Sequence, residues 1–402
     1  AGQALACQTV VTGDVTVWVP PREQMLERFE RGDRAEKVAD ESALRVHECS
    51  PEVTTLNVAV VEPTMTDNTP DWERLERELA RTHGVRASVP TLTALRHLPE
   101  ALRQAQGEVH VLVEQGGGTS GVNPSRLLDV LPGDVEARTT GLAIDIGTTT
   151  VAVCVADLDT GRILGQASAY NDQTARGEDV ISRIIYGRGV GRRQELRQLV
   201  VGTINALIDE VLDDVGLASE QVVFATVAGN TTMMHLFLGL PADHIRLEPY
   251  IPVAGSLPRF RARQLDLHLH PDATVDCLPS VGAYVGADIT AGVLRAGFHK
   301  EGPITLFIDV GTNGEMVLGN EEWLISCACS AGPAFEGAGA ASGMRAVPGA
   351  IEDAWIDPRT LDPTVTTLGD MPPLGICGSG MISLLGEMLV AGVIDKSGRI
   401  VL

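Results

Sequence analysis

The sequence is short of positive charge, and this shortage excludes whole classes of partner. Its 402 residues carry 31 Lys and Arg against 53 Asp and Glu, which gives a formal net charge of −22 at pH 7. Such a chain repels polyanions, so we expect no nucleic acid and no anionic membrane surface as a partner. A small phosphate ligand remains compatible with this charge, because backbone N–H groups and a metal ion can hold phosphate.

Cysteines and long apolar runs are also scarce. The seven cysteines are an odd number and lie scattered along the chain, so we expect no disulfide framework and a reducing, cytoplasmic location. No stretch approaches the roughly 18 uninterrupted apolar residues that a membrane span needs. The first residues show no basic segment followed by an apolar one, so no signal peptide is expected.

Three common catalytic motifs are missing as well. The chain contains no Gly-x-Ser-x-Gly elbow, no Walker lysine loop and no His-Glu-x-x-His helix. It contains instead a short motif, apolar strand–Asp–apolar–Gly–Thr, that occurs twice. The chemistry of the chain is therefore sought in that repeated turn.

The pattern of apolar residues predicts an α/β chain of two or three domains. A small α/β domain is expected at 51–138, and a more densely patterned region follows at 139–402. In the small domain we expect strands at 53–61 and 109–114, and helices at 71–83, capped by Asp71, and at about 92–106. In the second region we expect strands at 142–146, 151–157, 222–227, 304–308, 315–318 and 398–402, and helices at 192–215, 282–297 and 382–390.

The repeated motif reads DIGTTT at Asp145–Thr150 and DVGTNG at Asp309–Gly314. The second Asp follows the first by 309 − 145 = 164 residues, and this internal repeat predicts two related lobes. The glycine of each turn lets the backbone approach a phosphate, and the residues after it offer hydroxyl, amide and N–H donors. The expected phosphate-binding residues are Gly147, Thr148, Thr149, Thr150, Gly311, Thr312, Asn313 and Gly314.

The two aspartates of these turns have a separate predicted role. Asp145 and Asp309 stand where a carboxylate can hold Mg²⁺, through water, beside a phosphate. Two such hairpins facing across a cleft would clamp the triphosphate of ATP from both sides. A tight hairpin without a ligand is the alternative for either turn alone, and the repetition favours the nucleotide.

Two glycine-rich segments follow the second turn. GICGSGM precedes a helical run, and Gly375, Gly378, Ser379 and Gly380 are expected to flank the nucleoside, because glycines clear space and a helix start has unpaired N–H groups. The segment Ser330–Met344, which includes Gly332, is expected to line the floor of the cleft. For that segment, close packing of neighbouring elements is an equal alternative.

These motifs, in this order, resemble the ASKHA superfamily of acetate and sugar kinases, Hsp70 chaperones and actin. One family within it, the ferredoxin-fused, ATP-dependent reductive activators of corrinoid proteins, is similar in the stretches GLAIDIGTTTVAV, NDQTARGEDVISRI, AGNTTMMHLFLG, FIDVGTNGEMVLG, SCACSAGPAFEGAGAASGMRAVPGAIE and GICGSGMISLL. The resemblance implies duplicated actin/Hsp70/sugar-kinase-like (ribonuclease H-like) lobes at 139–402, the second incomplete. It identifies 1–20 as the C-terminal remnant of a [2Fe–2S] ferredoxin domain, 21–50 as a linker and 51–138 as a small middle domain.

The same resemblance implies a mechanism, with a corrinoid protein as partner and a homodimer as the assembly. Such activators deliver one electron to a Co(II) corrinoid protein and return it to Co(I), and ATP with Mg²⁺ supports the uphill transfer. The electron enters through a [2Fe–2S] cluster, of which Cys7 is the last ligand; the other three plant-type cysteines are absent, so this chain is expected to hold no cluster. Asp145, Asp309 and Glu315 take the catalytic positions.

Several alternatives stay open from the residues alone. Asn230 and Glu315 orient water or metal in one interpretation and are structural polar groups in the other. A small-molecule kinase of the same fold would need a catalytic base that no acidic residue clearly supplies, and a nucleotide-switched interaction module would need only the cleft. Smaller predictions are an Asp179–Arg183 ion pair, buried Cys327, Cys329 and Cys377, a packed His235, and Met233 and Met234 in the core.

Overall fold

The fold is given by a computed structural model. The residues that it describes are 51–85, 88–115, 124–135, 137–177, 179–297, 300, 302–311, 313–330, 340–344 and 346–401. Cys7, the predicted ferredoxin remnant at 1–20, the linker at 21–50, Thr312 and Gly332 lie outside these residues. Within the described part of the chain, no helix has both the length and the apolar character that crossing a membrane requires.

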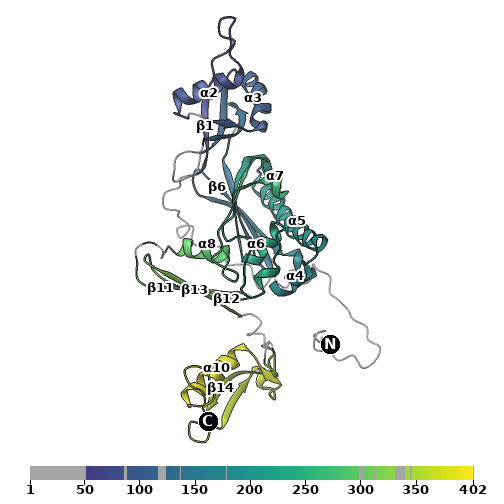
Figure 1. Ribbon diagram of the computed structural model, residues 1–402, viewed down its shortest axis with the longest axis vertical. Coiled ribbons are helices and arrows are strands. Elements are labelled where there is room, and N and C mark those ends of the chain that lie inside the picture. Colours follow the sequence, from purple (N-terminus) through teal and green to yellow (C-terminus); the bar gives the residue numbers. More distant parts are fainter. Residues whose placement is uncertain are drawn as a thin grey trace, which may run out of the picture. The chain divides into compact units, whose positions relative to one another are not determined.

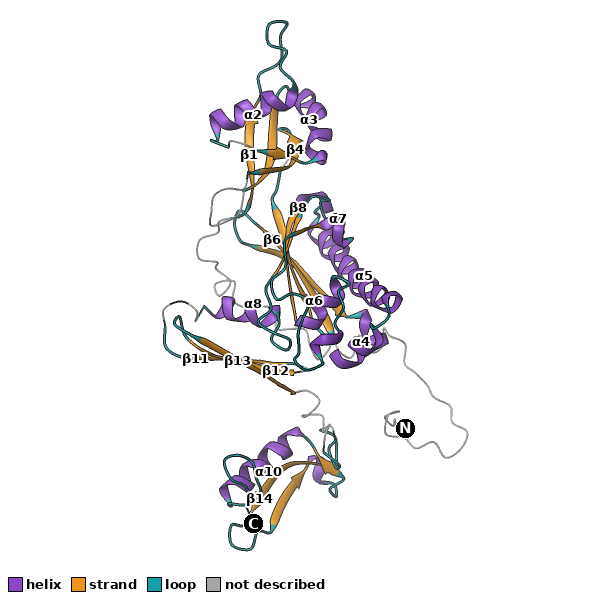
Figure 2. Ribbon diagram, in the orientation of Figure 1, coloured by secondary structure: helices purple, strands orange, loops and turns teal. Residues whose placement is uncertain are grey.

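The first sheet has four strands in the order β1-β3-β4-β2, and helices α2 and α3 pack against it (Figure 2). Its elements are β1 (Val53–Ala59), α2 (Asp71–Thr82), β2 (Val89–Pro90), α3 (Leu92–Gln104), β3 (Glu108–Glu114) and β4 (Arg126–Pro132). The predicted strands and helices of this region are confirmed, and β2 and β4 were not predicted. Both helices form for the expected reason: Leu75 and Leu79 of α2 and Leu98 of α3 are buried on one stripe against the sheet.

The predicted cap of α2 is wrong by one residue. Pro70 holds the N-cap position with an extended backbone and makes no side-chain cap hydrogen bond. Asp71 lies in the first turn, where its carboxylate accepts hydrogen bonds from Arg74 at 2.6 Å and Arg103 at 2.9 Å. An acidic residue is still favourable in that turn, because the unpaired N–H groups of a helix start carry partial positive charge.

The second sheet has six strands in the order β7-β6-β5-β8-β10-β9, and the long helix α5 runs along it (Figure 1). Its elements are β5 (Thr140–Ile146), β6 (Thr150–Asp157), β7 (Ile163–Tyr170), α4 (Val180–Tyr186), α5 (Val190–Val215), β8 (Val222–Gly229), α6 (Thr231–Phe237), β9 (Phe260–Arg261), α7 (Ala262–Leu265) and β10 (Thr274–Cys277). The predicted hairpin of β5 and β6 is confirmed and antiparallel. Ile144 and Val153 of the hairpin and Ile204 of α5 belong to one core cluster.

The third sheet repeats the hairpin and has the order β11-β12-β13. Its strands are β11 (Thr305–Val310), β12 (Asn313–Gly319) and β13 (Leu324–Ser330), and α8 (Ala287–Ala296) packs on one face through Ile289, Phe307 and Val317. Helix α8 begins five residues later than predicted, because residues 282–286 are not helical and form bends and irregular backbone. The predicted hairpin is confirmed: β11 and β12 pair antiparallel, with Asp309 opposite Glu315.

The other face of this sheet is apolar and exposed. Leu306, Ile308 and Val310 of β11 are 54%, 53% and 66% exposed. The register places Cys327 opposite Met316 and Cys329 opposite Gly314, and these are the partners of Ile308 and Val310. Both cysteines therefore lie on the exposed face and are themselves exposed, so the prediction that they are buried is wrong. Cys377 is buried, as predicted.

The fourth sheet has the order β15-β14-β16 and packs against helix α10. Its elements are β14 (Ala350–Ile356), β15 (Pro363–Thr367), β16 (Gly375–Ile376) and α10 (Gly378–Val390). The helix expected from residue 382 therefore begins four residues earlier, inside the glycine-rich motif. The strand predicted at 398–402 is wrong for its described residues, where one isolated bridge joins Ile394 to Ile400.

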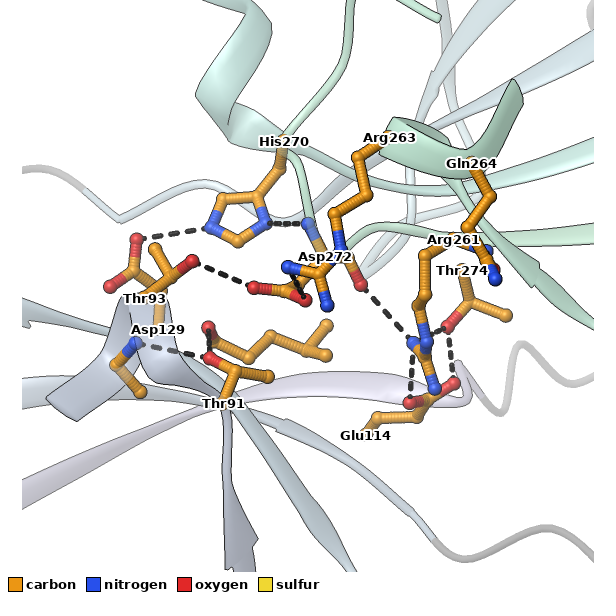
Figure 3. A network of polar contacts seen from close by, with 12 residues as sticks. Thr91, Thr93, Glu114, Asp129, Arg261, Arg263, Gln264, His270, Asp272 and Thr274 are labelled. Carbon is orange, nitrogen blue, oxygen red and sulfur yellow. Dashed lines mark hydrogen bonds and ion pairs between the residues drawn. The ribbon is translucent and has the colours of Figure 1, made fainter. Parts of the chain in front are cut away.

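A buried polar network joins the first sheet to the second (Figure 3). On one side, His270 bonds Asp129 at 3.1 Å and Thr93 donates to Asp272 at 2.7 Å. On the other, Arg261 pairs with Glu114 at 3.0 Å, and Thr274 also bonds Glu114. The partners in these contacts are far apart in the sequence: 141 residues for His270 and Asp129, and 179 residues for Thr93 and Asp272. The contacts therefore fix the two sheets to each other.

The network determines which ring nitrogen of His270 carries the proton. Its Nδ1 accepts the backbone N–H of Asp272 at 3.1 Å, so the ring proton sits on Nε2 and is donated to Asp129. Asp129 also accepts from His97 at 2.8 Å and from the backbone N–H of Val130 at 2.7 Å. Burial would raise the pKa of Asp129, but these hydrogen bonds, that of His270 foremost, outweigh burial and hold the pKa below its usual 3.8.

The variant Asp129→Asn is expected to lower the free energy of unfolding at pH 7 by about 1–3 kcal/mol, since an amide N–H₂ would then face N–H donors. The stability that the lowered pKa represents is present above 3.8 and is lost as pH falls through the lower folded-state pKa. The difference in free energy of unfolding between wild type and Asp129→Asn should therefore shrink as the pH is lowered below 3.8. Urea unfolding at pH 7 and at a pH below 3.8 measures this difference, and Asp134→Asn, at an exposed position, is the matched control. Equal stability of the two variants at pH 7 would contradict the prediction.

Candidate functional site

The two repeated turns occupy the same place in their hairpins. In the first, Ile146 pairs with Val151, a separation of 151 − 146 = 5 residues. In the second, Val310 pairs with Gly314, a separation of 314 − 310 = 4 residues. Asp145 and Asp309 each precede the last paired residue of the first strand. The predicted internal repeat is therefore present, with a second turn that is one residue shorter.

Gly147 is required by the shape of the first turn. A Cβ atom built on it would lie 2.5 Å from the carbonyl oxygen of Thr150, which is closer than real Cβ contacts come. The space that a side chain would need is taken by the returning strand. A residue other than glycine would therefore move the backbone of Thr148 and Thr149, the residues expected to contact phosphate.

The carbonyl oxygens of this turn point into the protein. The oxygen of Gly147 accepts from the side-chain amide of Asn171 at 2.9 Å, and the oxygen of Thr149 accepts from the backbone N–H of Asn171 at 2.8 Å. The oxygen of Thr148 accepts from Arg183 Nη2 at 2.5 Å. The backbone N–H groups of Gly147, Thr148 and Thr149 donate no hydrogen bond to any residue that the structure describes. These N–H groups are the ones that an anion would use.

Asn230 supports the same turn from the start of α6. Its Oδ1 accepts the backbone N–H of Met233 at 3.0 Å and so caps the helix. Its Nδ2 donates to Thr148 Oγ1 at 3.0 Å. Because Thr148 Oγ1 accepts this bond, its own proton is free to be donated to a ligand oxygen. Asn230 thus orients a hydroxyl of the turn, which is compatible with both interpretations given for it from the sequence.

Four carboxylates of the two turns and their neighbours influence one another electrostatically. The surrounding protein atoms, which displace water from the carboxyl group, and then the charges of Asp288 and Asp309 raise the pKa of Asp145 to about 6, while the residue as a whole still contacts solvent. The same three causes raise the pKa of Glu315 to about 7. The pKa of Asp288 is also raised, by burial and then by Asp309. The charge of Asp309 therefore acts on Asp145 across the two turns, and the cleft between the turns stays a prediction.

Asp288, in the first turn of α8, was missed by the sequence analysis. It is one of 53 acidic residues, and its segment resembles neither of the repeated turns, so no signal marked it. It is the second residue of α8, and its carboxylate accepts the backbone N–H of Ile289 at 2.8 Å. Within the described residues, no group of three or more His, Cys, Asp or Glu side chains is placed to hold a metal ion. A cation here would need most of its ligands from water and from a bound anion.

The glycines of the GICGSGM motif have a packing role in the structure. A Cβ on Gly380 would lie 2.2 Å from the carbonyl oxygen of Ile351, so β14 leaves no room for one. The hydroxyl of Ser379 lies 3.1 Å from the sulfur of Cys377. Among the described residues, no hydrogen bond or ion pair joins Gly375, Gly378, Ser379 or Gly380 to either turn. Their place beside a nucleoside therefore stays a prediction.

Among the remaining predictions for single residues, one is wrong and the others are confirmed. Asp179 caps α4 and accepts the N–H of Ser182 at 2.8 Å, while Arg183 donates to backbone carbonyls, so the predicted ion pair between them is wrong. His235 is packed as predicted: its Nδ1 bonds the carbonyl oxygen of Thr231, and its Nε2 accepts the N–H of Val253. Met233 and Met234 are core residues, 0% and 2% exposed.

Comparison with protein families gives matches along most of the chain. Residues 42–137 match a model described as the RACo linker region, and residues 140–301 match the RACo middle region. Residues 303–402 match the C-terminal domain of RACo, the ASKHA domain. The three models follow one another in a single order and belong to one family.

Individual relatives agree with these matches. The chain is 33% identical over 317 residues to the corrinoid activation enzyme RamQ of Eubacterium limosum, covering 78% of this chain and 51% of that protein. It is 34% identical over 138 residues to a [Co(II) methylated amine-specific corrinoid protein] reductase of Methanosarcina barkeri, covering 29% of this chain and 26% of that protein. A solved structure of a reductive activator for corrinoid, iron–sulfur protein is similar at 43% identity with a TM-score of 0.64, covering 89% of this chain and 56% of that one. The chain thus spans about half the length of RamQ and of that activator.

Proposed function

The chain belongs to the RACo family, and from this premise we propose that its full-length protein uses ATP to return a Co(II) corrinoid protein to Co(I) by one-electron transfer. The names of the relatives, a corrinoid activation enzyme, a corrinoid protein reductase and a reductive activator, support this reaction class. The balance is simple: one electron from a low-potential donor reduces one Co(II) to Co(I), and no bond of the protein is made or broken.

The proposal is supported by the chemistry of the two repeated turns. The first offers backbone N–H groups and a threonine hydroxyl, and the charge of Asp309 in the second acts on Asp145 in the first. Donors for phosphate next to carboxylates for a cation are what a metal-bound triphosphate needs. The nucleotide supplies the free energy that makes the electron transfer favourable.

The residues present fit Mg²⁺. Mg²⁺ keeps several waters and is held by one or two carboxylates together with phosphate oxygens, so it needs no group of three protein ligands. Asp145 and Asp309 would hold it in this way, and Glu315 and Asp288 would orient its waters. The raised pKa values of Asp145 and Glu315 support this assignment, because burial and then repulsion among the carboxylates disfavour the charged forms, and a nearby cation would offset both effects.

The [2Fe–2S] cluster has no site in the described residues, where no cysteine group is placed to hold metal. The sequence offers Cys7 as one ligand, which lies outside those residues, and the described cysteines have no part in the proposed electron transfer. We propose further that the protein works in the reducing cytoplasm and as a homodimer. Sedimentation of the full-length protein measures the assembly.

The proposed function is tested by spectroscopy on the full-length protein. The Co(II) form of a corrinoid protein is mixed with the activator, Mg-ATP and a low-potential reductant, and the absorption of Co(I) is followed. Co(I) should form with ATP and should not form when ADP replaces ATP or when the activator is left out. Formation of Co(I) at the same rate without ATP would overturn the proposal. Phosphorylation of a sugar or acid panel by the same protein would favour the kinase instead.

A further inference from the structure

Arg183 is a buried cation to which the proposed function assigns no part. It lies on α4 and is 0% exposed. Its Nε donates to the carbonyl oxygen of Gly177 at 2.8 Å, its Nη1 to Gln173 Oε1 at 3.3 Å, and its Nη2 to the carbonyl oxygen of Thr148 at 2.5 Å. The guanidinium therefore reaches the first repeated turn from the interior of the protein.

The positive charge of Arg183 has no carboxylate in contact with it among the described residues. Burial lowers its pKa to about 10, and the charge of Asp179, which does not touch it, raises the pKa in return. The side chain is therefore charged at neutral pH. Burying a charge is costly unless an opposite charge compensates it, and the partners of Arg183 are neutral: carbonyl and amide oxygens, and the sulfur of Met233 at 3.3 Å.

The turn has two sides, and Arg183 occupies one of them. The carbonyl oxygen of Thr148 accepts a hydrogen bond from Arg183. The carbonyl oxygens on either side, those of Gly147 and Thr149, accept hydrogen bonds from Asn171, which is also 0% exposed. A carbonyl oxygen directed at a phosphate would repel it. Because three consecutive carbonyls are held inward, the N–H groups of the turn are presented to the other side.

We propose that Arg183, together with Asn171, is a positioning residue of the phosphate site: it holds the first repeated turn with its N–H groups toward the nucleotide, and its buried charge is compensated by the bound phosphate. The inference rests on the proposed function, since it assumes that Mg-ATP binds at this turn. Arg183 does not touch the ligand; it acts through Thr148.

The test separates phosphate binding from general stability. Calorimetry of the full-length protein measures the affinity of Arg183→Met for Mg-ATP and for adenosine, which lacks phosphate. Mg-ATP should bind at least tenfold more weakly than to wild type, about 1.4 kcal/mol, and adenosine should be affected less than threefold. Arg81→Met, an exposed arginine of α2, is the matched control and should change neither affinity.

Two further variants keep the inference testable if Arg183→Met does not fold. Arg183→Lys keeps the charge, but one ammonium group cannot reach all three oxygens. The Lys variant should therefore bind Mg-ATP more weakly than wild type. If Arg183→Met folds, the affinity of the Lys variant should lie between those of wild type and Arg183→Met. Asn171→Asp keeps the shape but turns the donor that faces the Gly147 carbonyl into an acceptor, and should also weaken Mg-ATP selectively.

The outcomes distinguish the two proposals. Wild-type affinity for Mg-ATP in folded Arg183→Lys and Asn171→Asp would overturn the positioning role and leave the proposed function standing. Equal weakening of Mg-ATP and adenosine would also overturn it, because a merely structural residue would act in that way. Wild-type protein that binds no Mg-ATP would overturn both.

Discussion

Gly147→Ala is expected to weaken Mg-ATP binding by about a hundredfold, ~2.8 kcal/mol, and to abolish ATP-dependent activity at working nucleotide concentrations. The added Cβ would lie 2.5 Å from the carbonyl oxygen of Thr150, so the turn must open. Opening it turns the N–H groups of Thr148 and Thr149 away from the phosphate. Calorimetry of Mg-ATP binding and a melting curve of each protein measure the effect and confirm the fold.

The control for this variant is Gly202→Ala. Gly202 is exposed on α5, and a Cβ built on it meets nothing within 4 Å. Alanine is a better helix former than glycine by about 1 kcal/mol, so this variant should be as stable as wild type or more so, with unchanged Mg-ATP affinity. If both variants bind Mg-ATP like wild type, the first turn does not contact the nucleotide.

Asp309→Ala is expected to weaken Mg-ATP at least tenfold, about 1.4 kcal/mol, because it removes one of the two carboxylates assigned to Mg²⁺. The sign should reverse for ATP without metal. Asp309 repels a free triphosphate, as it repels Asp145 and Glu315, so metal-free ATP should bind the variant as well as wild type or better. Calorimetry with Mg²⁺ and with EDTA gives both numbers.

The opposite dependence on metal is what separates a magnesium ligand from a structural aspartate. Asp214→Ala, an exposed acid on α5, removes the same charge and should change neither affinity. Equal weakening of ATP with and without Mg²⁺ in Asp309→Ala would show a loss of structure and would contradict the metal assignment.

The repeated turns could be predicted from the sequence because their chemistry is local. Asp, Gly and Thr stand next to one another in the chain, and the strands on either side are marked by apolar residues. The partners of the turn could not be predicted in the same way. Asn171 reaches the first turn from the segment after β7, and Arg183 reaches it from α4. Asp288 lies on α8, and nothing in the sequence around these three residues specifies that they meet the turns.

Arg183 shows how a local reading goes wrong. Four residues separate it from Asp179, and that spacing on one helix face favours an ion pair. Asp179 is used instead to cap the helix, where the unpaired N–H of Ser182 needs an acceptor. The guanidinium is then free to turn inward, toward carbonyl oxygens that only the folded chain brings together.

The prediction that Cys327 and Cys329 are buried was wrong for a related reason. Cysteine is among the residue types most often buried, and Cys377 follows that tendency. Cys327 and Cys329 do not, because their burial depends on which face of β13 they occupy and on what covers that face. Residue type carries no information on either point.

The exposed thiols of Cys327 and Cys329 give the protein a built-in footprinting probe. They stand two residues apart on one strand, so both report on the same apolar face, while Cys277 and Cys377 are shielded. Alkylation rates read by mass spectrometry would therefore measure, without any engineered label, how accessible that face is. A change in rate on adding nucleotide or a corrinoid protein would show that the addition alters this accessibility.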